Sequence, residues 1–319
     1  MIFCLLLLGT GALVGGGWWI WQRPGPLEAG RDVVVPHGDT LTVWHDLAAA
    51  GVVQDDDLAR MVFRATIWLT RRDGALHAAE LAFPAHVSLA KVVWVLRHAP
   101  PVQHHLTIPE GWTAWRVAAQ LKATDTLTGE TPPIPEGSVL PQTIAFLRGT
   151  PRATVVRRLQ HMMDGALARV WAGRDASLTL PDAHALLVLA SIVERETGRP
   201  AERPQVARVF LNRLAQGMRL QSDPTVIYDL SEGTGAIDHP LTRAELDESG
   251  PENTYRIAGL PPAPICSPGL ATLEAVAHPA SGDALYFVAT GTGGHRFAAT
   301  LDEHNRNVAA YRKSGKDGR

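Results

Sequence analysis

The sequence predicts an α+β protein that starts with an apolar N-terminal span and continues as a small and then a larger globular region. Three observations lead to this fold class. Residues 1–22 carry no charge, strand and helix patterns alternate from Val33 onward, and Pro100 and Pro101 separate the two regions. The chain has 319 residues, 45% of them hydrophobic and 19% charged, so each region can bury a core.

The first element is the stretch MIFCLLLLGTGALVGGGWWIWQ. As a helix, residues 2–21 would extend over about 30 Å, which matches the thickness of a bilayer core. Three tryptophans gather at one end of this stretch, as they do at membrane interfaces. A cleaved signal peptide is the alternative, but it lacks a basic start and a small-residue cleavage site. We expect a retained transmembrane anchor at 1–22 and a linker at 23–32.

The small region, residues 33–104, begins with a short strand and two helices. Asp39 or Thr40 would cap the first helix, and acids at 55–57 stand where the dipole of the second favours them. A strand near Ala78–Phe83 and a helix at Leu89–Arg97 complete this α+β unit.

The larger region, residues 105–313, opens with the strand, turn and helix of LTIPEGWTAWRVAAQL, followed by a Pro- and Gly-rich loop at 126–142. Capping and stop signals predict helices at Arg152–Trp171, Asp182–Thr197, about Gln205–Gln216 and Leu301–Arg312. A Gly- and Thr-rich turn predicts a hairpin with strands at Leu285–Ala289 and His295–Ala298. We expect a disordered tail at 314–319.

Composition argues against several functions. The formal net charge is −2 and no basic cluster occurs, so nucleic-acid binding is not expected. The two cysteines, Cys4 and Cys266, form no CxxC motif, and the 13 histidines include no HExxH motif. We therefore expect neither a metal site nor a cofactor.

Two acids at the end of one helix are the main candidates for chemistry. In LASIVERETG, residues 189–198, Glu194 shares a helical face with Ala190, and Glu196 shares one with Ile192. Both faces are apolar, so periodicity does not choose between the two acids. A carboxyl group held against an apolar surface keeps its proton to higher pH, as a general acid requires. A helix end that simply reaches water is the alternative.

Two later blocks supply polar groups suited to a sugar. RVFLNRLAQGMRLQSDPTVIYDL reads as a helix and then an irregular segment in which Pro224 keeps Asp223 extended, and ENTYRIAGLPPAPICSPG reads as a rigid loop. Amides, hydroxyls and aromatic rings are the groups that bind sugars. The candidate substrate-binding residues are Asn212, Gln221, Asp223, Thr225, Tyr228, Asn253, Tyr255, Arg256 and His295. Turn, capping, ion-pairing or hairpin-fixing roles are the alternatives for Asp223, Arg256 and His295.

Five blocks in this order resemble the endolytic murein transglycosylase family, also called YceG-like. They are LASIVERETG, VFLNRLAQGMRLQSDPTVIYDL, NTYRIAGLPPAPICSPG, AVAHPA and LYFVATGTGGHRFAATLDEHN. The resemblance is strong over Ala185–Lys313 and looser over Val33–Gln160, through VPHGDTL, GVV and TIPEG. The sequence departs from the family at LPQTIAF, where Gln142 replaces an acid and Ile144 an aromatic residue.

The resemblance implies a protein held in the inner membrane by one N-terminal helix and acting on the periplasmic side. It implies a LysM-like first domain and a catalytic second domain that cuts peptidoglycan strands between N-acetylmuramic acid and N-acetylglucosamine, leaving 1,6-anhydro ends. Glu194 matches the family's catalytic glutamate, and Glu196 is the fallback. By analogy, a membrane-tethered cutter would work with a peptidoglycan synthase and terminate nascent strands.

Two other functions fit the same patterns. A non-catalytic, membrane-anchored peptidoglycan-binding scaffold of the wall-synthesis machinery would keep the fold without depending on Glu194. A hydrolase would cut the same glycan with water and usually needs a second carboxylate. A lytic transglycosylase needs one acid, because the C6 hydroxyl of the substrate is the internal nucleophile.

Overall fold

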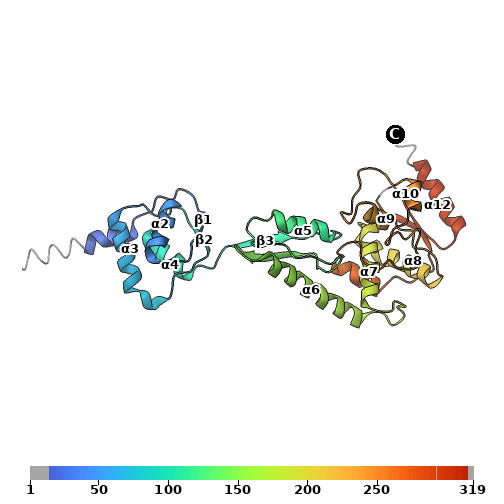
Figure 1. Ribbon diagram of the computed structural model, residues 1–319, viewed down its shortest axis with the longest axis horizontal. Helices are drawn as coiled ribbons and strands as arrows, with labels where there is room; N and C mark the ends of the chain where they lie inside the picture. The colour runs from blue at the N-terminus through green and yellow to red at the C-terminus, as the bar shows by residue number, and fades with distance from the viewer. Residues whose placement is uncertain (1–13, 292, 315–319) are drawn as a thin grey trace, which may run out of the picture. The chain divides into compact units, whose positions relative to one another are not determined.

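The computed structural model describes residues 14–291 and 293–314 (Figure 1). The chain divides into two compact units, one comprising residues up to His104 with Ala145–Gly149, and one comprising His105–Ile144 with the chain from Thr150 onward. Each unit contains helices and strands, so the predicted α+β class is confirmed.

The described chain contains helices and strands in the following order. They are β1 (Arg31–Val34), α2 (Thr40–Ala49), α3 (Asp57–Leu69), η1 (Arg71–Asp73), β2 (Glu80–Phe83), α4 (Leu89–His98), β3 (Gln103–Thr107), α5 (Ala114–Ala123), β4 (Thr143–Leu147), α6 (Arg152–Gly173), α7 (Ala183–Glu196), η2 (Pro200–Glu202), α8 (Arg203–Ala215), α9 (Asp223–Leu230), α10 (Arg243–Asp247), α11 (Leu270–Ala277), β5 (Tyr286–Ala289), β6 (His295–Ala298) and α12 (Leu301–Ser314).

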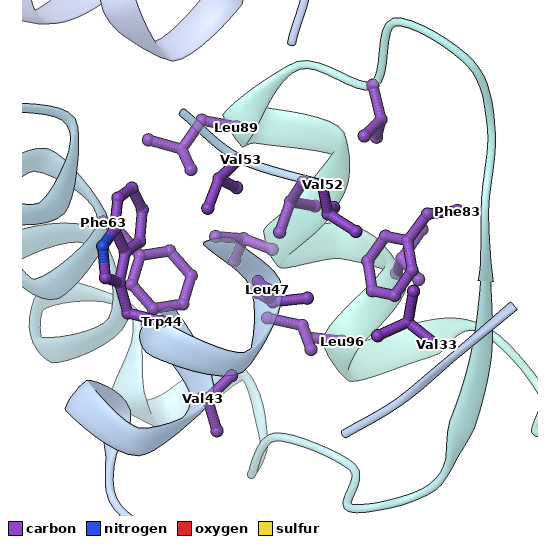
Figure 2. Packing of buried hydrophobic residues seen from close by; sticks show 14 of the residues in the cluster. Val33, Val43, Trp44, Leu47, Val52, Val53, Phe63, Phe83, Leu89 and Leu96 are labelled. Atoms are coloured by element: carbon purple, nitrogen blue, oxygen red, sulfur yellow. The ribbon is translucent and has the colours of Figure 1, made fainter. Parts of the chain in front are cut away.

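The first unit is a two-stranded sheet packed with three helices. β1 and β2 pair antiparallel, with Val33 opposite Leu81. Of the two expected caps, Asp39 is the one that caps α2, and its side chain accepts a hydrogen bond from the backbone N–H of Thr42. The core is centred on Trp44 and Phe63, both fully buried, with ring centroids 5.3 Å apart (Figure 2). Aromatic side chains of this size supply much of a small unit's hydrophobic stabilisation.

The segment before β1 packs onto this core. Residues 14–22 are helical, Ile20 is buried, and Arg23 forms an ion pair with Asp56 at 2.6 Å. Leu27, within the expected linker, is also buried. Most of the expected span at residues 2–21 lies outside the described residues. Among the helices that are described, none combines the length and the apolar character needed to cross a membrane.

The second unit carries the longest helix and a buried helical centre. β3 and β4 form a two-stranded sheet whose residues are divided between the two units. α6 extends two residues beyond its predicted end, and α7 follows the prediction closely, with Asp182 as its N-cap and Thr197 as its C-cap. Every residue of α7 from 185 to 193 is buried, because α6, α8 and α11 pack around it.

The segment around Asp223 differs from the prediction. We expected Pro224 to keep Asp223 extended in an irregular segment, but Asp223 is the first residue of helix α9. The extended residue is Ser222, the N-cap. Pro224 stands in the first turn, where a helix does not need its missing N–H, so it starts the helix rather than preventing it.

The hairpin and the last helix agree with the sequence. β5 pairs antiparallel with β6, with Phe287 opposite Phe297, and α12 packs against both strands. Among the described elements of the larger region, β4, η2, α9, α10 and α11 have no counterpart in the prediction.

Candidate active site

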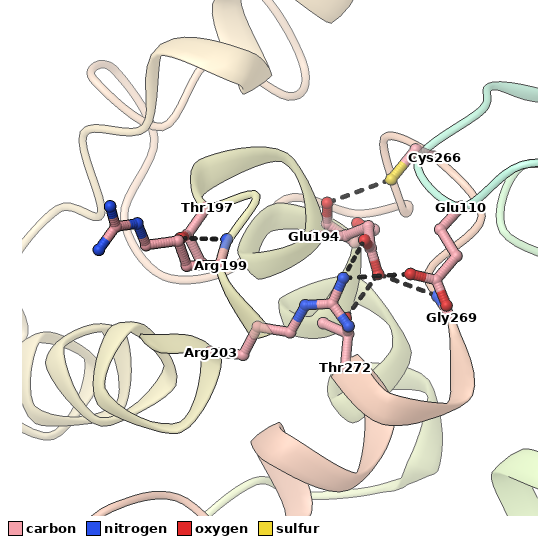
Figure 3. A network of polar contacts seen from close by, with 9 residues as sticks. Glu110, Glu194, Thr197, Arg199, Arg203, Cys266, Gly269 and Thr272 are labelled. Atoms are coloured by element: carbon pink, nitrogen blue, oxygen red, sulfur yellow. Dashed lines mark hydrogen bonds and ion pairs between the residues drawn. The ribbon is translucent and has the colours of Figure 1, made fainter. Parts of the chain in front are cut away.

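Helix α7 carries Glu194 into a pocket of hydrogen-bond donors at its C-terminal end. The side chain of Glu194 is 5% exposed. Its Oε2 accepts hydrogen bonds from the backbone N–H of Gly269 at 3.0 Å and from Oγ1 of Thr272 at 2.5 Å (Figure 3). Its Oε1 accepts one from Nη2 of Arg203 at 3.0 Å. The wall beside Glu194 is therefore polar on one side, rather than wholly apolar as the helix pattern suggested.

A second carboxylate shares the same arginine. Nη2 of Arg203 also lies 3.1 Å from Oε2 of Glu110, which stands in the loop between β3 and α5. The side chain of Arg203 is 9% exposed and that of Glu110 is 45% exposed. The buried guanidinium of Arg203 therefore lies between an exposed carboxylate, Glu110, and a buried carboxylate, Glu194. Sequence analysis did not single out Glu110, although it lies in the family-like TIPEG block.

Backbone bonds hold the Glu110 loop beside the loop that precedes α11. The N–H of Gly111 donates to the carbonyl of Ser267 at 2.9 Å, and the N–H of Ser267 donates to the carbonyl of Trp112 at 2.8 Å. These paired bonds fix the spacing between the two loops. The loop of Glu110 is thus tied to the loop that leads to Gly269, one of the donors to Glu194.

Cys266 lies behind the site and has a structural environment. Its thiol contacts the carbonyl oxygen of Ser191 at 3.2 Å. Burial raises the pKa of the Cys266 thiol well above its ordinary value, so the reactive thiolate is disfavoured.

Glu196 occupies a different environment on another face of α7. Its carboxylate accepts a hydrogen bond from Oγ of Ser222. Burial, with a contribution from the negative charge of Asp223, raises the pKa of Glu196 to about 7. The pKa increase expected for a buried acid at this helix end thus occurs at Glu196.

Asp223 and Tyr255 form a pair near Glu196. Oη of Tyr255 donates to Oδ1 of Asp223 at 2.6 Å. Burial and this contact raise the pKa of Tyr255 above its ordinary value. Gln221 is exposed close by, with a φ of +52°, and its backbone N–H donates to the carbonyl of Thr254 at 3.2 Å.

Two predicted binding residues are buried and engaged within the protein. Thr225 is fully buried, and its hydroxyl donates to the carbonyl of Ser222 at 2.7 Å. Asn253 is 1% exposed, and its amide donates to the carbonyls of Leu246 and Glu248 at 3.2 and 2.7 Å. The Thr225 contact closes the first turn of α9, and the Asn253 contacts bind its loop to the end of α10.

Tyr228 and Asn212 also contact other parts of the second unit. The hydroxyl of Tyr228 donates to Glu136 at 3.1 Å. The amide of Asn212 donates to the carbonyls of Gly282 and Ala284 at 3.2 and 3.0 Å, just before the hairpin.

Arg256 and His295 each face an acid. Arg256 lies 3.7 Å from Asp247 and is 47% exposed. Nδ1 of His295 lies 2.7 Å from Glu202, and its backbone N–H donates to the same carboxylate at 3.1 Å. Burial opposes ionisation of Glu202, but the bonds from His295 outweigh it and lower the pKa of Glu202. No group of three or more His, Cys, Asp or Glu side chains within residues 14–291 and 293–314 is placed to hold a metal ion.

The fold and the site together define an α+β protein whose candidate active site is built around one buried carboxylate. This carboxylate, Glu194, lies at the end of a central helix and accepts hydrogen bonds from three donors. The sequence profile of the YceG-like family matches residues 33–310, and the chain belongs to this family. A crystal structure of a yceG-like protein from Listeria monocytogenes is similar, with 27% sequence identity and a TM-score of 0.53. The similarity covers 88% of this chain and 99% of that one.

Two curated relatives have the name endolytic murein transglycosylase. The Bacillus subtilis (strain 168) protein is 41% identical over 128 residues, which are 40% of this chain and 34% of that protein. The Streptococcus pneumoniae (strain D39) protein is 32% identical over 183 residues, which are 55% of this chain and 32% of that one. The chain thus matches about a third of the length of these relatives.

Proposed function

We propose that the protein is an endolytic lytic transglycosylase of peptidoglycan, and that Glu194 is its catalytic acid and base. The observation that carries the proposal is the setting of Glu194, buried at the end of α7 with its carboxyl group oriented by Gly269, Thr272 and Arg203. The name endolytic murein transglycosylase of two relatives supports the choice of substrate and reaction.

The reaction needs one carboxyl group in two successive states. Protonated Glu194 donates its proton to the oxygen that links N-acetylmuramic acid to N-acetylglucosamine, and the bond from C1 to that oxygen breaks. The carboxylate then takes the proton of the muramic acid C6 hydroxyl, whose oxygen bonds to C1 and closes a 1,6-anhydro ring. General acid–base catalysis of this kind typically contributes about 10²–10⁴-fold. The internal nucleophile adds a proximity effect, so water is not consumed.

Substrate contacts are proposed for the exposed and partly exposed polar residues. Gln221, the Asp223–Tyr255 pair and Arg256 present hydrogen-bonding groups toward the surface of the second unit. Asn212, Thr225, Tyr228, Asn253 and His295 would act mainly by fixing the loops and the hairpin that carry these groups, since their own polar atoms bond within the protein.

We also propose that residues 1–22 anchor the protein in the inner membrane and that the second unit works on the periplasmic side. The apolar N-terminal sequence and the exposed Trp18 and Trp19 support this placement. The first unit would be a LysM-like glycan-binding domain, supported by a 470 Å³ groove that Trp68, Arg64 and Arg71 help to line. A peptidoglycan synthase is the proposed partner, with strand termination as the outcome.

Product analysis tests the proposed reaction. The full chain in detergent is incubated with un-crosslinked glycan strands, and the fragments are identified by mass spectrometry. Anhydro ends are expected; reducing ends would indicate a hydrolase, and intact strands would indicate a scaffold. The full chain is required because Ile20 and Leu27 belong to the core of the first unit.

Glutamine substitution tests the assignment of the acid. Glu194→Gln should reduce cleavage by at least about 10²-fold with the fold retained, because glutamine has no proton to donate. Glu196→Gln is the matched variant, two residues away on the same helix, and should cleave normally. The reverse result would move the catalytic role to Glu196.

A further inference from the structure

Helix α3 of the first unit is apolar on two sides. On one side Ala59 and Phe63 lie in the core, with 5% and 0% of their surface exposed. On another side Leu58, Met61 and Leu69 are 52%, 61% and 69% exposed. A helix at the surface of a water-soluble domain normally has one apolar and one polar face. A second apolar face that stays open to solvent is typical of a binding surface.

The exposed apolar side chains form one continuous stripe. Leu58, Met61, Ala65 and Leu69 follow one another at intervals of three, four and four residues, and all of them are exposed. Residues at these intervals lie on the same face of a helix. Trp68, 64% exposed, stands at the edge of the stripe. We call these five residues the outer face of α3. The described elements α2, α4 and η1 pack against α3 but leave the outer face open.

Arginines border the outer face at the C-terminal end of α3. Arg64 lies one turn before Trp68, and Arg71 and Arg72 follow the helix in η1; all three arginines are exposed. The guanidinium of Arg71 lies over the ring of Trp68, 4.8 Å from its centroid. An apolar helix face that carries tryptophan and is bordered by arginines is typical of helices that lie in the interface of an anionic membrane.

The acids at the N-terminal end of α3 face arginines of the same unit. Asp56 forms an ion pair with Arg23 at 2.6 Å. Arg60 forms an ion pair with Asp57, and its guanidinium lies 4.0 Å from Asp55. Because a nearby cation offsets the charge of each of these carboxylates, they repel an anionic surface less than unpaired acids would.

The N-terminal segment joins the first unit next to α3. Residues 14–22 are helical, and Ile20 within them is buried in the core of the unit. Arg23 follows directly and pairs with Asp56, the N-cap of α3. Residues 1–13, which lie outside the described residues, carry no charged side chain and are mostly apolar in sequence. A bilayer that holds this segment would therefore meet the first unit at the start of α3, without a flexible spacer.

We infer that the outer face of α3 docks on the lipid bilayer, with its apolar side chains at the boundary of headgroups and acyl chains and its arginines on anionic headgroups. The inference rests on the proposed membrane anchor at residues 1–22. A glycan strand fits this face less well, because Leu58, Met61 and Leu69 offer no side-chain hydrogen-bonding groups. The groove proposed for glycan is a neighbouring surface that none of these three residues lines.

Fluorescent labels on the full chain test the docking. Met61→Cys and Leu69→Cys are made in a Cys4→Ser background, in which Cys266 is fully buried and stays unlabelled. Each variant is labelled with an environment-sensitive dye and reconstituted into vesicles of phosphatidylglycerol and phosphatidylcholine, with and without doxyl-labelled lipid. Doxyl groups quench a dye that lies among the acyl chains, so most of the emission of both labels should be lost.

Two further variants make the result specific. Glu130→Cys carries the label on an exposed loop of the second unit and should keep most of its emission. Leu58→Asp, introduced into the Met61→Cys protein, places a charge within the outer face. Because a charged side chain is disfavoured at the acyl boundary, this change should reduce the quenching of the label. Leu58 is 52% exposed, so the fold should be retained.

The outcomes separate the docking from the proposed anchor. A protein that does not float with the vesicles overturns both. A protein that floats, but whose labels at 61 and 69 are quenched no more than the label at 130, overturns the docking and leaves the anchor standing. Quenching that Leu58→Asp does not reduce also overturns the docking, because the label would then only lie near the bilayer. A blue-shifted emission that doxyl lipid does not quench overturns it too, since a protein or a glycan would cover the face.

Discussion

Replacing Glu196 with glutamine should change how the stability of the protein depends on pH. Burial, helped by the charge of Asp223, raises the pKa of Glu196 from an ordinary value of 4.5 to about 7. In the unfolded chain this group ionises near its ordinary value. Between these two values the unfolded chain releases a proton that the folded protein keeps, so the free energy of unfolding falls as pH rises. Above about pH 7 this decrease in the free energy of unfolding is complete.

The size of this effect follows from the shift. One pKa unit corresponds to about 1.4 kcal/mol, so ionised Glu196 should lower the free energy of unfolding by about 3 kcal/mol above pH 7. Glutamine has nearly the same shape, stays neutral and still accepts the hydrogen bond from Ser222. The variant should therefore be similar to the wild type near pH 5 and more stable near pH 8.

Urea unfolding of the full chain, followed by tryptophan fluorescence at several pH values, measures this difference. Glu252 titrates in the same window, because burial and the neighbouring Asp229 raise its pKa to about 7. Ionisation of Glu252 will make the free energy of unfolding fall with rising pH in both proteins. The test is therefore the difference between the variant and the wild type. Glu130→Gln serves as the exposed control. An equal effect of Glu196→Gln at pH 5 and pH 8, or a less stable variant at pH 8, would refute the reasoning.

Two further predictions concern groups outside the acid pair. Arg213→Met should lower the free energy of unfolding by about 2–4 kcal/mol in urea titrations, since its buried guanidinium donates to the carbonyls of Leu285 and Leu220 at 2.7 Å each. Normal stability of this variant would show that water satisfies those carbonyls. In a Cys4→Ser background, Cys266 should react with a thiol reagent only on unfolding, because it is fully buried. Rapid labelling of the native protein would contradict the buried position.

Local sequence signals predicted the elements that have clear ends. Asp182 and Gly198 bracket α7, and the Gly- and Thr-rich turn places the hairpin. β4 was missed because it follows directly on a Pro- and Gly-rich loop, although the alternating burial of Ile144 and Phe146 is a strand pattern. α11 is only eight residues long and is mostly buried, so it has little amphipathic signal.

Only part of the candidate site could be predicted, because local sequence signals do not show which distant segments come together. The sequence indicated the SIVERE block and the YceG-like family, and the family is confirmed. It did not indicate that Glu194 and Glu196 have different surroundings, because successive faces of a buried helix look alike in the sequence. The polar residues near Asp223 and Asn253 matched a sugar-binding composition, yet several of them bond to neighbouring loops.

The sequence by itself determined the α+β class, the order of most helices, the family and the helix end that carries the acids. These features depend on spacing and capping within a few turns of chain. Only the tertiary structure decided that Arg203 lies between Glu110 and Glu194, and that burial raises the pKa of Glu196. Charge and burial depend on groups that approach from distant segments, and no local pattern encodes their distance.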